Sequence, residues 1–358
     1  MSDARFMALA LSLGRRGMGR VWPNPAVGCV LVRDGVVLGR GWTGDGGRPH
    51  AETIALSQAG NAKEATAYVT LEPCAHHGKT PPCAQALIDA GVARVVIATG
   101  DPDPRVAGKG IAMLGSAGIP VDIGCRKAEA DLDHQGFFQK VTQQRPFLTL
   151  KLASTLDGRI ATHQGHSQWI TSAQSRRVVH AMRARHDAVM VGAGTVEADD
   201  PMLNVRGMGT VPQPVRIVLS GKLDLRNGLH IAATAREQPV WLFHRPDVDP
   251  LRWQNRGADT FAQDPKDLRA VMVALAESGI TRVFCEGGGT LGASLLQAGL
   301  VDELVVFTAG CAIGADGTPS LQAIGVDTMD DAPRFVRTGI QAVGPDVLTC
   351  WRPATPKD

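Results

Sequence analysis

The sequence predicts an α/β protein with two domains. Short apolar segments rich in β-branched residues alternate with helical segments along the chain, which is typical of sheets covered by helices. The 358 residues also exceed the ~250–300 at which a single hydrophobic core stops growing. The alternation stops once, between Cys125 and Arg145, where the sequence turns polar and helical, and it resumes at Pro146. We therefore predict a first domain over residues 1–145 and a second over 146–358.

The first domain opens with a predicted helix over residues 3–18, capped at its start by Ser2 or Asp3. A hairpin follows, because two strand-like segments flank Asp34-Gly35, a dipeptide that favours tight turns. The remaining elements alternate: strands at 27–32 and 36–41, a helix at 50–59, a strand at 67–71, a helix at 83–90, a strand at 94–99 and a helix and strand at about 108–123. Together they predict a small mixed sheet with helices on its faces.

The second domain starts with a strand over residues 146–153 and repeats the alternation. Its further predicted strands lie at 189–191, 215–219, 240–243, 282–285 and 303–308. Gly287–Gly289 follows one of these strands and precedes a predicted helix at 291–298. Glycines there let the backbone approach a diphosphate at a helix N-terminus, although a plain turn explains the same residues equally well.

The composition excludes several classes of partner. Apolar residues make up 44% of the chain and charged residues 20%. The net charge is +2 with acids and bases interspersed, so no basic surface large enough for nucleic acid is visible. No apolar run is long enough to span a membrane. Aromatic residues make up only 4%, too few for stacking on single-stranded nucleic acid. The seven cysteines are scattered and odd in number, which favours a reducing cytoplasm over a disulfide framework. We expect a cytoplasmic protein that binds small molecules, without nucleic acid or membrane, and that forms a homo-oligomer.

His50-Ala51-Glu52, followed by Cys74 and Cys83, carries the chemistry of the first domain. An imidazole and two thiolates are typical zinc ligands, and three protein ligands leave the fourth tetrahedral position for water, as in catalytic sites. Zinc deaminases of nucleobases combine such a site with a glutamate that moves protons without binding the metal. We therefore predict His50, Cys74 and Cys83 as ligands of one Zn2+ ion and Glu52 as the catalytic acid and base. The alternative is a packed histidine with two incidental cysteines.

Eight residues separate Cys74 from Cys83, where the generic deaminase pattern has two. Both ends of this segment are predicted to bind the metal, so the segment must project near the site. It carries His76, His77 and Lys79, which are potential donors to a substrate phosphate. Two alternatives stay open: one of the histidines is an additional zinc ligand, or the segment is simply a solvated surface loop.

Several stretches of the first domain are more specific than zinc ligation alone. They are Pro23-Asn24-Pro25 with Val27-Gly28, Pro49 to Glu52, Val69 to Cys74, His77 to Cys83, and Asp101 to Pro104 with Val106-Ala107-Gly108. These stretches resemble the deaminase domain of the bifunctional riboflavin-biosynthesis deaminase/reductase family. The resemblance implies a cytidine-deaminase-like α/β/α fold that deaminates a phosphoribosylated diaminopyrimidinone, with Asn24, His76 and Lys79 in contact with the substrate. Thr43 departs from the family, whose members commonly carry histidine there, so that contact is lost or made differently.

The second domain carries a matching set of stretches. They are Lys151 to Arg159, Ser167 to Thr171, Val191 to Thr195 with Asp199-Asp200-Pro201, and Glu286 to Leu291. They resemble the reductase domain of the same family, so the resemblance covers almost the whole chain. It implies a dihydrofolate-reductase-like α/β fold that uses NADPH, the choice over NADH resting on the resemblance alone. Ala309-Gly310-Cys311 departs from the family's common Pro-Lys, which leaves the role of that loop open.

The resemblance also assigns residues of the second domain to two ligands. The NADPH site would be lined by Ala153, Trp169, Thr195, Asp199, Ser220 and the run Gly288, Gly289, Thr290, Leu291, Gly292, Ala293 and Ser294. The phosphoribosylamino substrate would be held by Lys151, Ser167, Arg183, Leu203, Arg206 and Glu286. From residue chemistry alone, Arg183 and Arg206 suit either a phosphate or an exposed salt bridge, and Trp169 suits the core equally well. Asp199 is a candidate proton donor.

These observations predict a bifunctional enzyme of riboflavin synthesis. Its first domain deaminates the pyrimidine with Zn2+, and its second reduces the ribosyl side chain to ribityl with NADPH. Two other functions stay open: a deaminase of a nucleoside, a free base or tRNA, and a non-catalytic zinc-stabilised ligand sensor. The long loop between the cysteines, the few aromatic residues and the second domain disfavour the former. Glu52 and the open metal position disfavour the latter.

Overall fold

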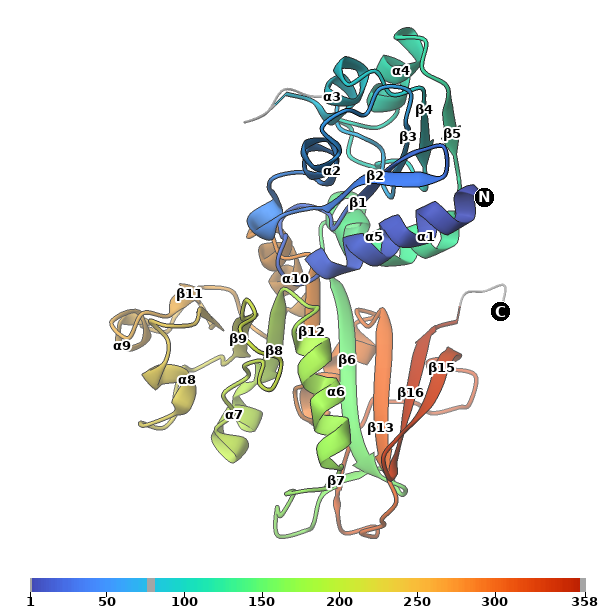
Figure 1. Ribbon diagram of the computed structural model, residues 1–358. Coiled ribbons are helices and arrows are strands. Elements are labelled where there is room, and N and C mark those ends of the chain that lie inside the picture. The colour runs from blue at the N-terminus through green and yellow to red at the C-terminus, as the bar shows by residue number, and fades with distance from the viewer. Residues whose placement is uncertain (1, 76–80, 355–358) are drawn as a thin grey trace. The chain divides into compact units, whose positions relative to one another are not determined.

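The computed structural model of the chain describes residues 2–75 and 81–354 (Figure 1). Its contacts divide it into two compact units, one of residues 1–145 with 279–281 and one of residues 146–278 with 282–358. The first is the N-terminal unit and the second the C-terminal unit.

The N-terminal unit is built on a five-stranded sheet with the strand order β2-β1-β3-β4-β5. Its strands are β1 (Gly28–Arg33), β2 (Val36–Trp42), β3 (Thr66–Val69), β4 (Arg94–Ile97) and β5 (Val121–Ile123). β1 pairs antiparallel with β2 and β3, whereas β3, β4 and β5 are parallel. The turn between β1 and β2 has a positive φ at Asp34 (52°) and at Gly35 (77°), as a tight hairpin turn requires. The predicted mixed sheet and its hairpin are confirmed.

Helices cover both faces of this sheet (Figure 1). They are α1 (Asp3–Gly14), α2 (Ala51–Ala59), α3 (Cys83–Asp89), α4 (Lys109–Ser116) and α5 (Lys127–Gln143), with short 3-10 turns at Arg15–Gly17 and Asp45–Gly47. Buried side chains of α2, α3 and α4 form one hydrophobic cluster with the sheet, and those of α1 and α5 form another. Successive residues of β1 point to opposite faces, so Leu31 joins the first cluster and Val30 the second. The result is a three-layer α/β/α arrangement.

α2 packs directly on the backbone of β2. A Cβ atom added at Gly39 would lie 2.1 Å from the carbonyl oxygen of Ala55, and one added at Gly41 would lie 2.3 Å from that of Ala51. Only glycine permits so short a distance between strand and helix at these positions. The two glycines therefore set the position of α2, whose first turn carries part of the site described below.

The sheet of the C-terminal unit has the strand order β11-β10-β9-β8-β12-β6-β13-β16-β15. Its strands are β6 (Phe147–Thr155), β8 (Ala188–Gly192), β9 (Val215–Leu219), β10 (Val240–Phe243), β11 (Asp259–Phe261), β12 (Arg282–Cys285), β13 (Glu303–Ala309), β15 (Phe335–Val343) and β16 (Asp346–Pro353). The strands from β11 to β13 are all parallel, and β16 and β15 continue the sheet antiparallel at one edge. A separate two-stranded ribbon pairs β7 (Arg159–Ala161) with β14 (Thr318–Pro319).

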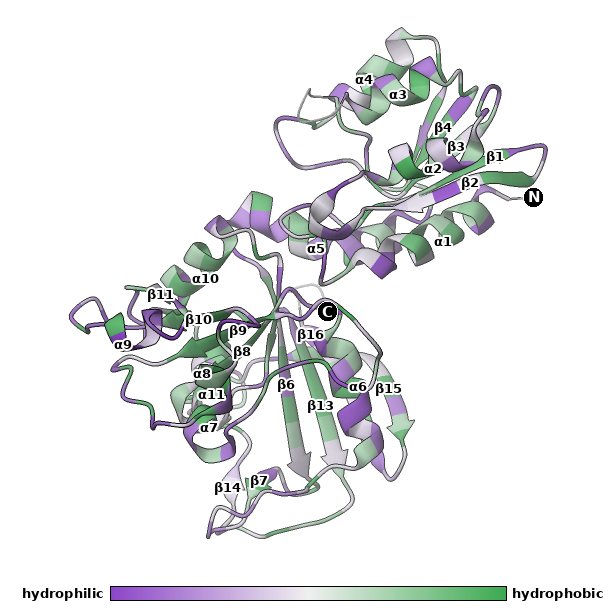
Figure 2. Cartoon of the chain, turned by 60° about the vertical axis from the view of Figure 1, so that its left-hand side comes forward, coloured by the Kyte–Doolittle hydropathy of each residue, from purple (hydrophilic) through white to green (hydrophobic). Residues whose placement is uncertain are grey.

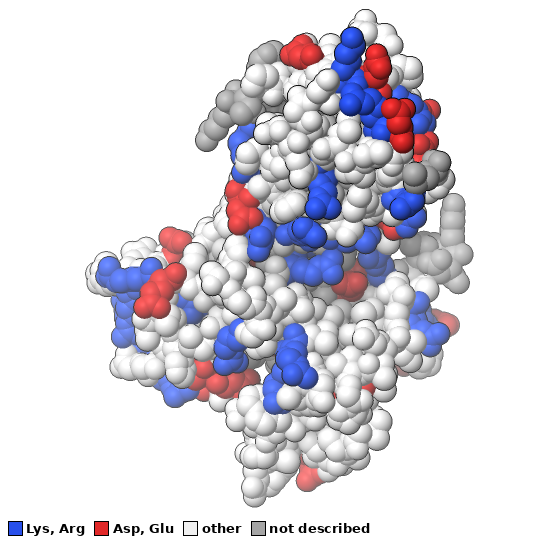
Figure 3. Space-filling view, viewed as in Figure 1, with Lys and Arg blue, Asp and Glu red and all other residues white. Residues whose placement is uncertain are grey.

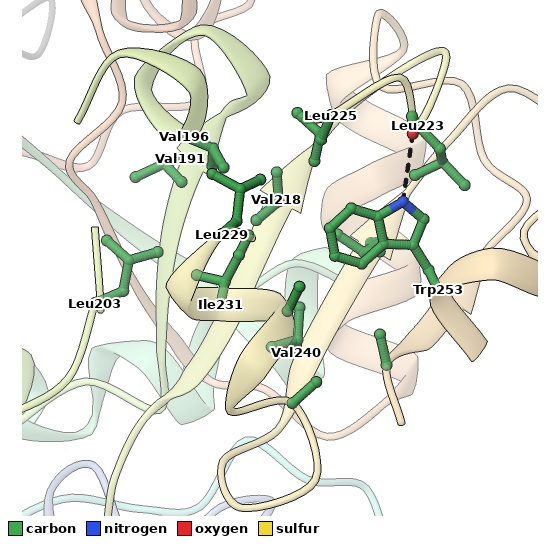
Figure 4. Close-up of a cluster of buried hydrophobic side chains, with 14 of the residues drawn as sticks. Val191, Val196, Leu203, Val218, Leu223, Leu225, Leu229, Ile231, Val240 and Trp253 are labelled. Atoms are coloured by element: carbon green, nitrogen blue, oxygen red, sulfur yellow. Dashed lines mark hydrogen bonds between the residues drawn. The ribbon is translucent and has the colours of Figure 1, made fainter. Parts of the chain in front are cut away.

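Hydrophobic clusters hold helices to this sheet. The helices are α6 (Ala173–Arg183), α7 (Ala193–Asp199), α8 (His230–Ala233), α9 (Leu251–Gln254), α10 (Leu268–Glu277) and α11 (Gly289–Gln297). β8, β9 and β10 read as nearly continuous hydrophobic runs, as buried parallel strands do (Figure 2). They pack against the side chain of Trp253, whose indole Nε1 donates a hydrogen bond of 3.3 Å to the Leu223 carbonyl (Figure 4). A second cluster joins Val179 of α6 to Phe284 of β12 and Phe307 of β13.

Acidic and basic side chains are mixed on the face of the chain shown in Figure 3. This distribution agrees with the net charge of +2. Among the helices of the described residues, none combines the length and the apolar character that crossing a membrane requires.

Candidate active sites

The three predicted zinc ligands come together in the N-terminal unit. His50 immediately precedes α2, Cys74 lies in the loop after β3, and Cys83 is the first residue of α3. Their ligand atoms all lie within 4.8 Å of one another, with His50 Nδ1 3.1 Å from the Cys83 sulfur and 3.7 Å from the Cys74 sulfur. Tetrahedral zinc with bonds of about 2.0 Å to nitrogen and 2.3 Å to sulfur places neighbouring ligands about 3.6 Å apart. The donor set and its spacing therefore fit a zinc ion.

The two cysteines differ in their surroundings. The backbone N–H of Cys83, at the first turn of α3, donates to the Cys74 sulfur at 3.3 Å. The hydrogen bond from the Cys83 thiol lowers the pKa of Cys74 to about 4, helped by His50 and opposed by burial. One sulfur is thus held as the thiolate that a metal requires.

Glu52 lies in the first turn of α2 and is only 4% exposed. Burial raises the pKa of its carboxyl group, while the nearby charge of His50 opposes that rise. A hydrogen bond also connects its carboxyl group to the Cys83 thiol. The helix therefore places a carboxyl group beside the three ligands while the ligand set remains complete without it.

Two further predicted positions of this unit have defined surroundings. The Asn24 side-chain amide donates to the Gly47 carbonyl at 3.2 Å, in the loop that leads to His50. Thr43 is buried, and its hydroxyl accepts from the N–H of Val27 at 3.0 Å and donates to the Pro25 carbonyl at 3.1 Å. Its hydroxyl is therefore committed to the backbone of its own unit. The predicted substrate residues His76 and Lys79 lie outside the described residues.

The C-terminal unit gathers its predicted residues at the carboxyl ends of the parallel strands. Gly192 ends β8, Ser220 follows β9 and Glu286 follows β12. Because these strands are parallel, their ends share one edge of the sheet, which is where α/β sheets bind ligands. Ser220 is itself buried, and its N–H donates to the Phe243 carbonyl at 3.0 Å.

A cluster of charged side chains, three of them partly buried and one exposed, lies beside this edge. Arg183, the last residue of α6, binds Glu286 through both carboxylate oxygens, at 2.5 Å from Nε and 3.1 Å from Nη2. Arg183 also donates to the Asn204 carbonyl at 2.8 Å. Burial lowers the pKa of Lys151, and the charge of Glu286 opposes this. Burial raises the pKa of Asp199, and Lys151 opposes that rise, so four predicted residues act on one another here.

The N-terminus of α11 meets the start of α7 at the same edge. The N–H of Gly288 donates to the Thr195 hydroxyl at 3.0 Å, which joins two predicted cofactor positions. Of the run from 288 to 294, Gly289, Gly292 and Ala293 are buried in packing. The Ser294 hydroxyl donates to the Thr290 carbonyl within the helix at 3.1 Å. Thr290 is the exposed residue of this run, and Gly288, Leu291 and Ser294 are partly exposed.

The other predicted residues of this unit are more scattered. Trp169 is 69% exposed, so the alternative of a core tryptophan is wrong, and the Arg176 guanidinium lies 4.3 Å from its ring centre. Leu203 belongs to the buried cluster and is only 2% exposed. Ser167 is partly exposed and Ala153 packs at the margin of the cluster under α6.

One residue of this site was not predicted. His180 lies one turn before Arg183 on α6, with its Nδ1 3.1 Å from the Asn204 carbonyl and 3.3 Å from the N–H of Arg206. It thereby ties the loop that carries Arg206 to the helix that carries Arg183. The spacing of three residues between His180 and Arg183, which places both on one helix face, was the available signal.

Family models match both halves of the chain. Residues 1–99 match the cytidine and deoxycytidylate deaminase zinc-binding region, and residues 146–349 match the RibD C-terminal domain. The fold and the sites thus define a deaminase of the zinc-binding type joined to a reductase domain. The predicted α/β class, with a cytidine-deaminase-like domain before a reductase domain, is confirmed.

Relatives match over nearly the full length. The riboflavin biosynthesis protein RibD of Escherichia coli is 43% identical, covering 97% of this chain and 98% of that protein, and RibD of Aquifex aeolicus is 40% identical, covering 98% of each. A solved structure of Acinetobacter baumannii RibD has a TM-score of 0.90 at 37% identity, covering 98% of this chain and 99% of that one. A diaminohydroxyphosphoribosylaminopyrimidine deaminase/5-amino-6-(5-phosphoribosylamino)uracil reductase of Thermotoga maritima has a TM-score of 0.89 at 34% identity, covering 98% of each.

The chain belongs to the RibD family of riboflavin biosynthesis proteins. It is accordingly a bifunctional enzyme, a deaminase and a reductase. The comparisons do not favour the two alternative functions, a nucleoside or tRNA deaminase and a non-catalytic sensor.

Proposed function

We propose that the chain carries out two successive reactions of riboflavin synthesis. In residues 1–145 it converts 2,5-diamino-6-(5-phosphoribosylamino)pyrimidin-4-one to the corresponding uracil and releases ammonia. In residues 146–358 it reduces the ribosyl side chain of that product to ribityl with NADPH. The convergence of His50, Cys74 and Cys83 beside Glu52 carries the proposal, and the reactions named for the Thermotoga relative support the choice of substrates.

In the deaminase site, His50, Cys74 and Cys83 would hold one zinc ion. Zinc supplies a water that is nucleophilic near neutral pH. Glu52 accepts the proton of the attacking water and delivers it to the ring nitrogen and then to the leaving amine. Its place in the first turn of α2, two residues after His50, suits both roles. His76 and Lys79 would bind the substrate phosphate.

In the reductase site, the first turn of α11, Thr195 and the end of β9 would bind NADPH. NADPH supplies a hydride for the anomeric carbon, whose imine form is electrophilic. Lys151, Arg183 and Glu286 would orient the substrate and keep water from the reacting carbon. Asp199, an exposed carboxyl group whose charge interacts with that of Lys151, would donate the proton.

The proposal extends to the cell compartment and the assembly. The chain has seven free cysteines, which supports a reducing cytoplasm as its place of action. We also propose that the chain forms a homo-oligomer. Sedimentation of the purified chain measures the number of subunits.

One incubation tests both reactions. The purified chain is mixed with the phosphoribosylated diaminopyrimidinone, with and without NADPH, while ammonia release and NADPH oxidation are followed. We expect ammonia in both cases and NADPH oxidation only after ammonia release begins. A chelated sample should release no ammonia, yet it should still oxidise NADPH when it receives the deaminated product. Absence of ammonia release from the zinc-loaded chain would contradict the deaminase assignment.

A further inference from the structure

Glu72 is a buried carboxylate with an unusual set of partners. It follows β3, lies two residues before Cys74 and is 4% exposed. Its Oε2 accepts the N–H of Gly108 at 3.0 Å and that of Asp101 at 3.4 Å. Its Oε1 accepts the N–H of Gly110 at 3.0 Å and that of Ile111 at 3.3 Å. One carboxylate therefore serves four backbone N–H groups.

Three of these donors belong to the start of α4. Gly108 immediately precedes this helix, and Gly110 and Ile111 lie in its first turn, where N–H groups have no partner within the helix. A carboxylate at this position satisfies the unpaired donors and interacts favourably with the helix dipole. Glu72 thus caps α4 from a distant part of the chain and joins it to the segment that ends at Cys74.

The backbone contact at Gly110 is equally close. A Cβ atom added at Gly110 would lie 1.9 Å from the Pro73 carbonyl oxygen. Residues 72 and 73 therefore contact α4 in two ways, through the Glu72 side chain and through the Pro73 backbone carbonyl. The N–H of Glu72 adds a hydrogen bond of 3.0 Å to the Thr99 carbonyl after β4.

Cys74 is held from its other side by α3. The N–H of Ala84 donates to the Cys74 carbonyl at 3.1 Å, and the N–H of Cys83 donates to the Cys74 sulfur at 3.3 Å. The segment 72–74 thus spans the distance between α4 and α3. Its position sets how far the Cys74 sulfur lies from His50.

We propose that Glu72 is a positioning residue for the metal site. Its carboxylate fixes the backbone before Cys74 and so keeps the Cys74 sulfur at ligand distance from His50 and Cys83. Groups that orient metal ligands in this way contribute to metal affinity without touching the metal. The inference rests on the proposed zinc site and adds a residue to it.

Glu72→Gln tests the inference with nearly unchanged side-chain volume. The amide NH2 turns one acceptor atom into a donor that faces two backbone N–H groups, so the segment before Cys74 should shift. We expect the zinc dissociation constant of the full chain, measured by chelator competition, to rise about 10–100-fold. With Co2+ in the site, the ligand-field and thiolate charge-transfer bands should change. The reductase rate of the same protein with the deaminated product should stay at the wild-type value.

Asp3→Asn is the matched control. Asp3 also pairs within the N-terminal unit, with Arg94 and Tyr68, but it contacts no ligand of the site. This variant should lose stability and keep the wild-type zinc affinity and cobalt spectrum. Glu72→Asp retains a carboxylate on a shorter side chain, so its zinc affinity should lie between those of wild type and Glu72→Gln. If Glu72→Gln does not fold, Glu72→Asp tests the inference in its place.

Two outcomes separate the inference from the proposed function. A Glu72→Gln protein with wild-type zinc affinity and an unchanged cobalt spectrum overturns the inference alone. A wild-type chain that binds neither metal at His50, Cys74 and Cys83 overturns the proposed deaminase site and the inference with it.

Discussion

At the scale of single residues, the deaminase site depends on where helices begin. His50 and Cys83 both lie at helix starts, and Glu52 lies in the first turn of the first of these helices. Helix starts offer free N–H groups and a positive dipole end, which stabilise thiolate and carboxylate groups. The same placement brings Glu52 next to the proposed metal ligands and leaves it outside that ligand set.

We predict that Glu52→Gln removes deamination and leaves zinc bound. Gln retains the size of the side chain but cannot carry the transferred proton, so the rate should fall by at least about 10²–10⁴-fold. Ammonia release and metal content of the purified chain measure the two effects. Glu64→Gln, on the surface of the same unit, is the control and should keep full activity. Normal deamination by Glu52→Gln would show that another group moves the proton.

Arg183 and Glu286 test whether a buried ion pair serves the fold or the substrate. Their side chains are 12% and 10% exposed, so Arg183→Ala removes the hydrogen-bonded partner of a largely buried carboxylate and leaves only the charge of Lys151 near it. This variant should lower the free energy of unfolding by about 3 kcal/mol. Arg183→Met with Glu286→Leu removes both charges and should recover most of that stability. Denaturant unfolding measures both proteins.

Reductase kinetics of the double variant separate the two roles. We expect a large rise in KM for the deaminated substrate even though the protein is stable, because the groups that orient the substrate are gone. Wild-type KM in the stable double variant would show that the pair serves the fold alone.

At the scale of elements, hydrophobic patterning predicted the buried strands best. The strands expected at 215–219, 240–243 and 282–285 have those bounds in the structure, because parallel strands covered on both sides are apolar throughout. β15 and β16 were not predicted. Most of β15 is exposed at the edge of the sheet, so its residues carry no hydrophobic alternation to read. α8 and α9 have four residues each, too few to show helical periodicity.

We predict that Gly41→Ala impairs the deaminase while the reductase keeps working. The added methyl group would lie 2.3 Å from the Ala51 carbonyl and must push α2 away from β2, which costs about 1–3 kcal/mol or more. Because the first turn of α2 carries Glu52 and follows His50, zinc content and ammonia release should fall. Gly46→Ala is the control for a glycine replaced without a steric clash, because a Cβ added there meets no atom within 4 Å. The positive φ of Gly46 adds some backbone strain to this control. Unchanged zinc binding in Gly41→Ala would show that α2 tolerates the displacement.

At the scale of the whole molecule, each unit contains a buried histidine whose pKa is lowered by burial, His134 in the N-terminal unit and His186 in the C-terminal unit. Burial lowers the pKa of His134 in the N-terminal unit to about 4 and that of His186 in the C-terminal unit to about 3. The unfolded chain takes up these protons near the ordinary pKa of about 6.5. Stability is therefore complete above pH ~6.5 and falls as the pH drops toward the folded-state values.

We predict a loss of about 2 kcal/mol per buried histidine between pH 6.5 and pH 5. His134→Gln removes one of these groups and keeps a hydrogen-bonding side chain. The drop in its unfolding free energy between pH 6.5 and pH 5 should therefore be about 2 kcal/mol smaller than that of the wild type. Denaturant titrations at several pH values, with the exposed His163→Gln as control, measure the difference. Parallel pH curves for wild type and His134→Gln would contradict the burial argument.

The sequence by itself determined the chemistry of this protein. The proposed zinc site of His50, Glu52, Cys74 and Cys83 could be predicted because zinc ligation needs particular side chains, and the α/β class followed from local hydrophobic patterns. Only the tertiary structure decided the supports of that chemistry. Glu72 contacts residues 29 to 39 positions away, and Arg183 pairs with a carboxylate 103 positions away. A local sequence pattern cannot predict such partners. They come together only when distant elements pack, because the polar groups that packing buries need hydrogen-bond partners.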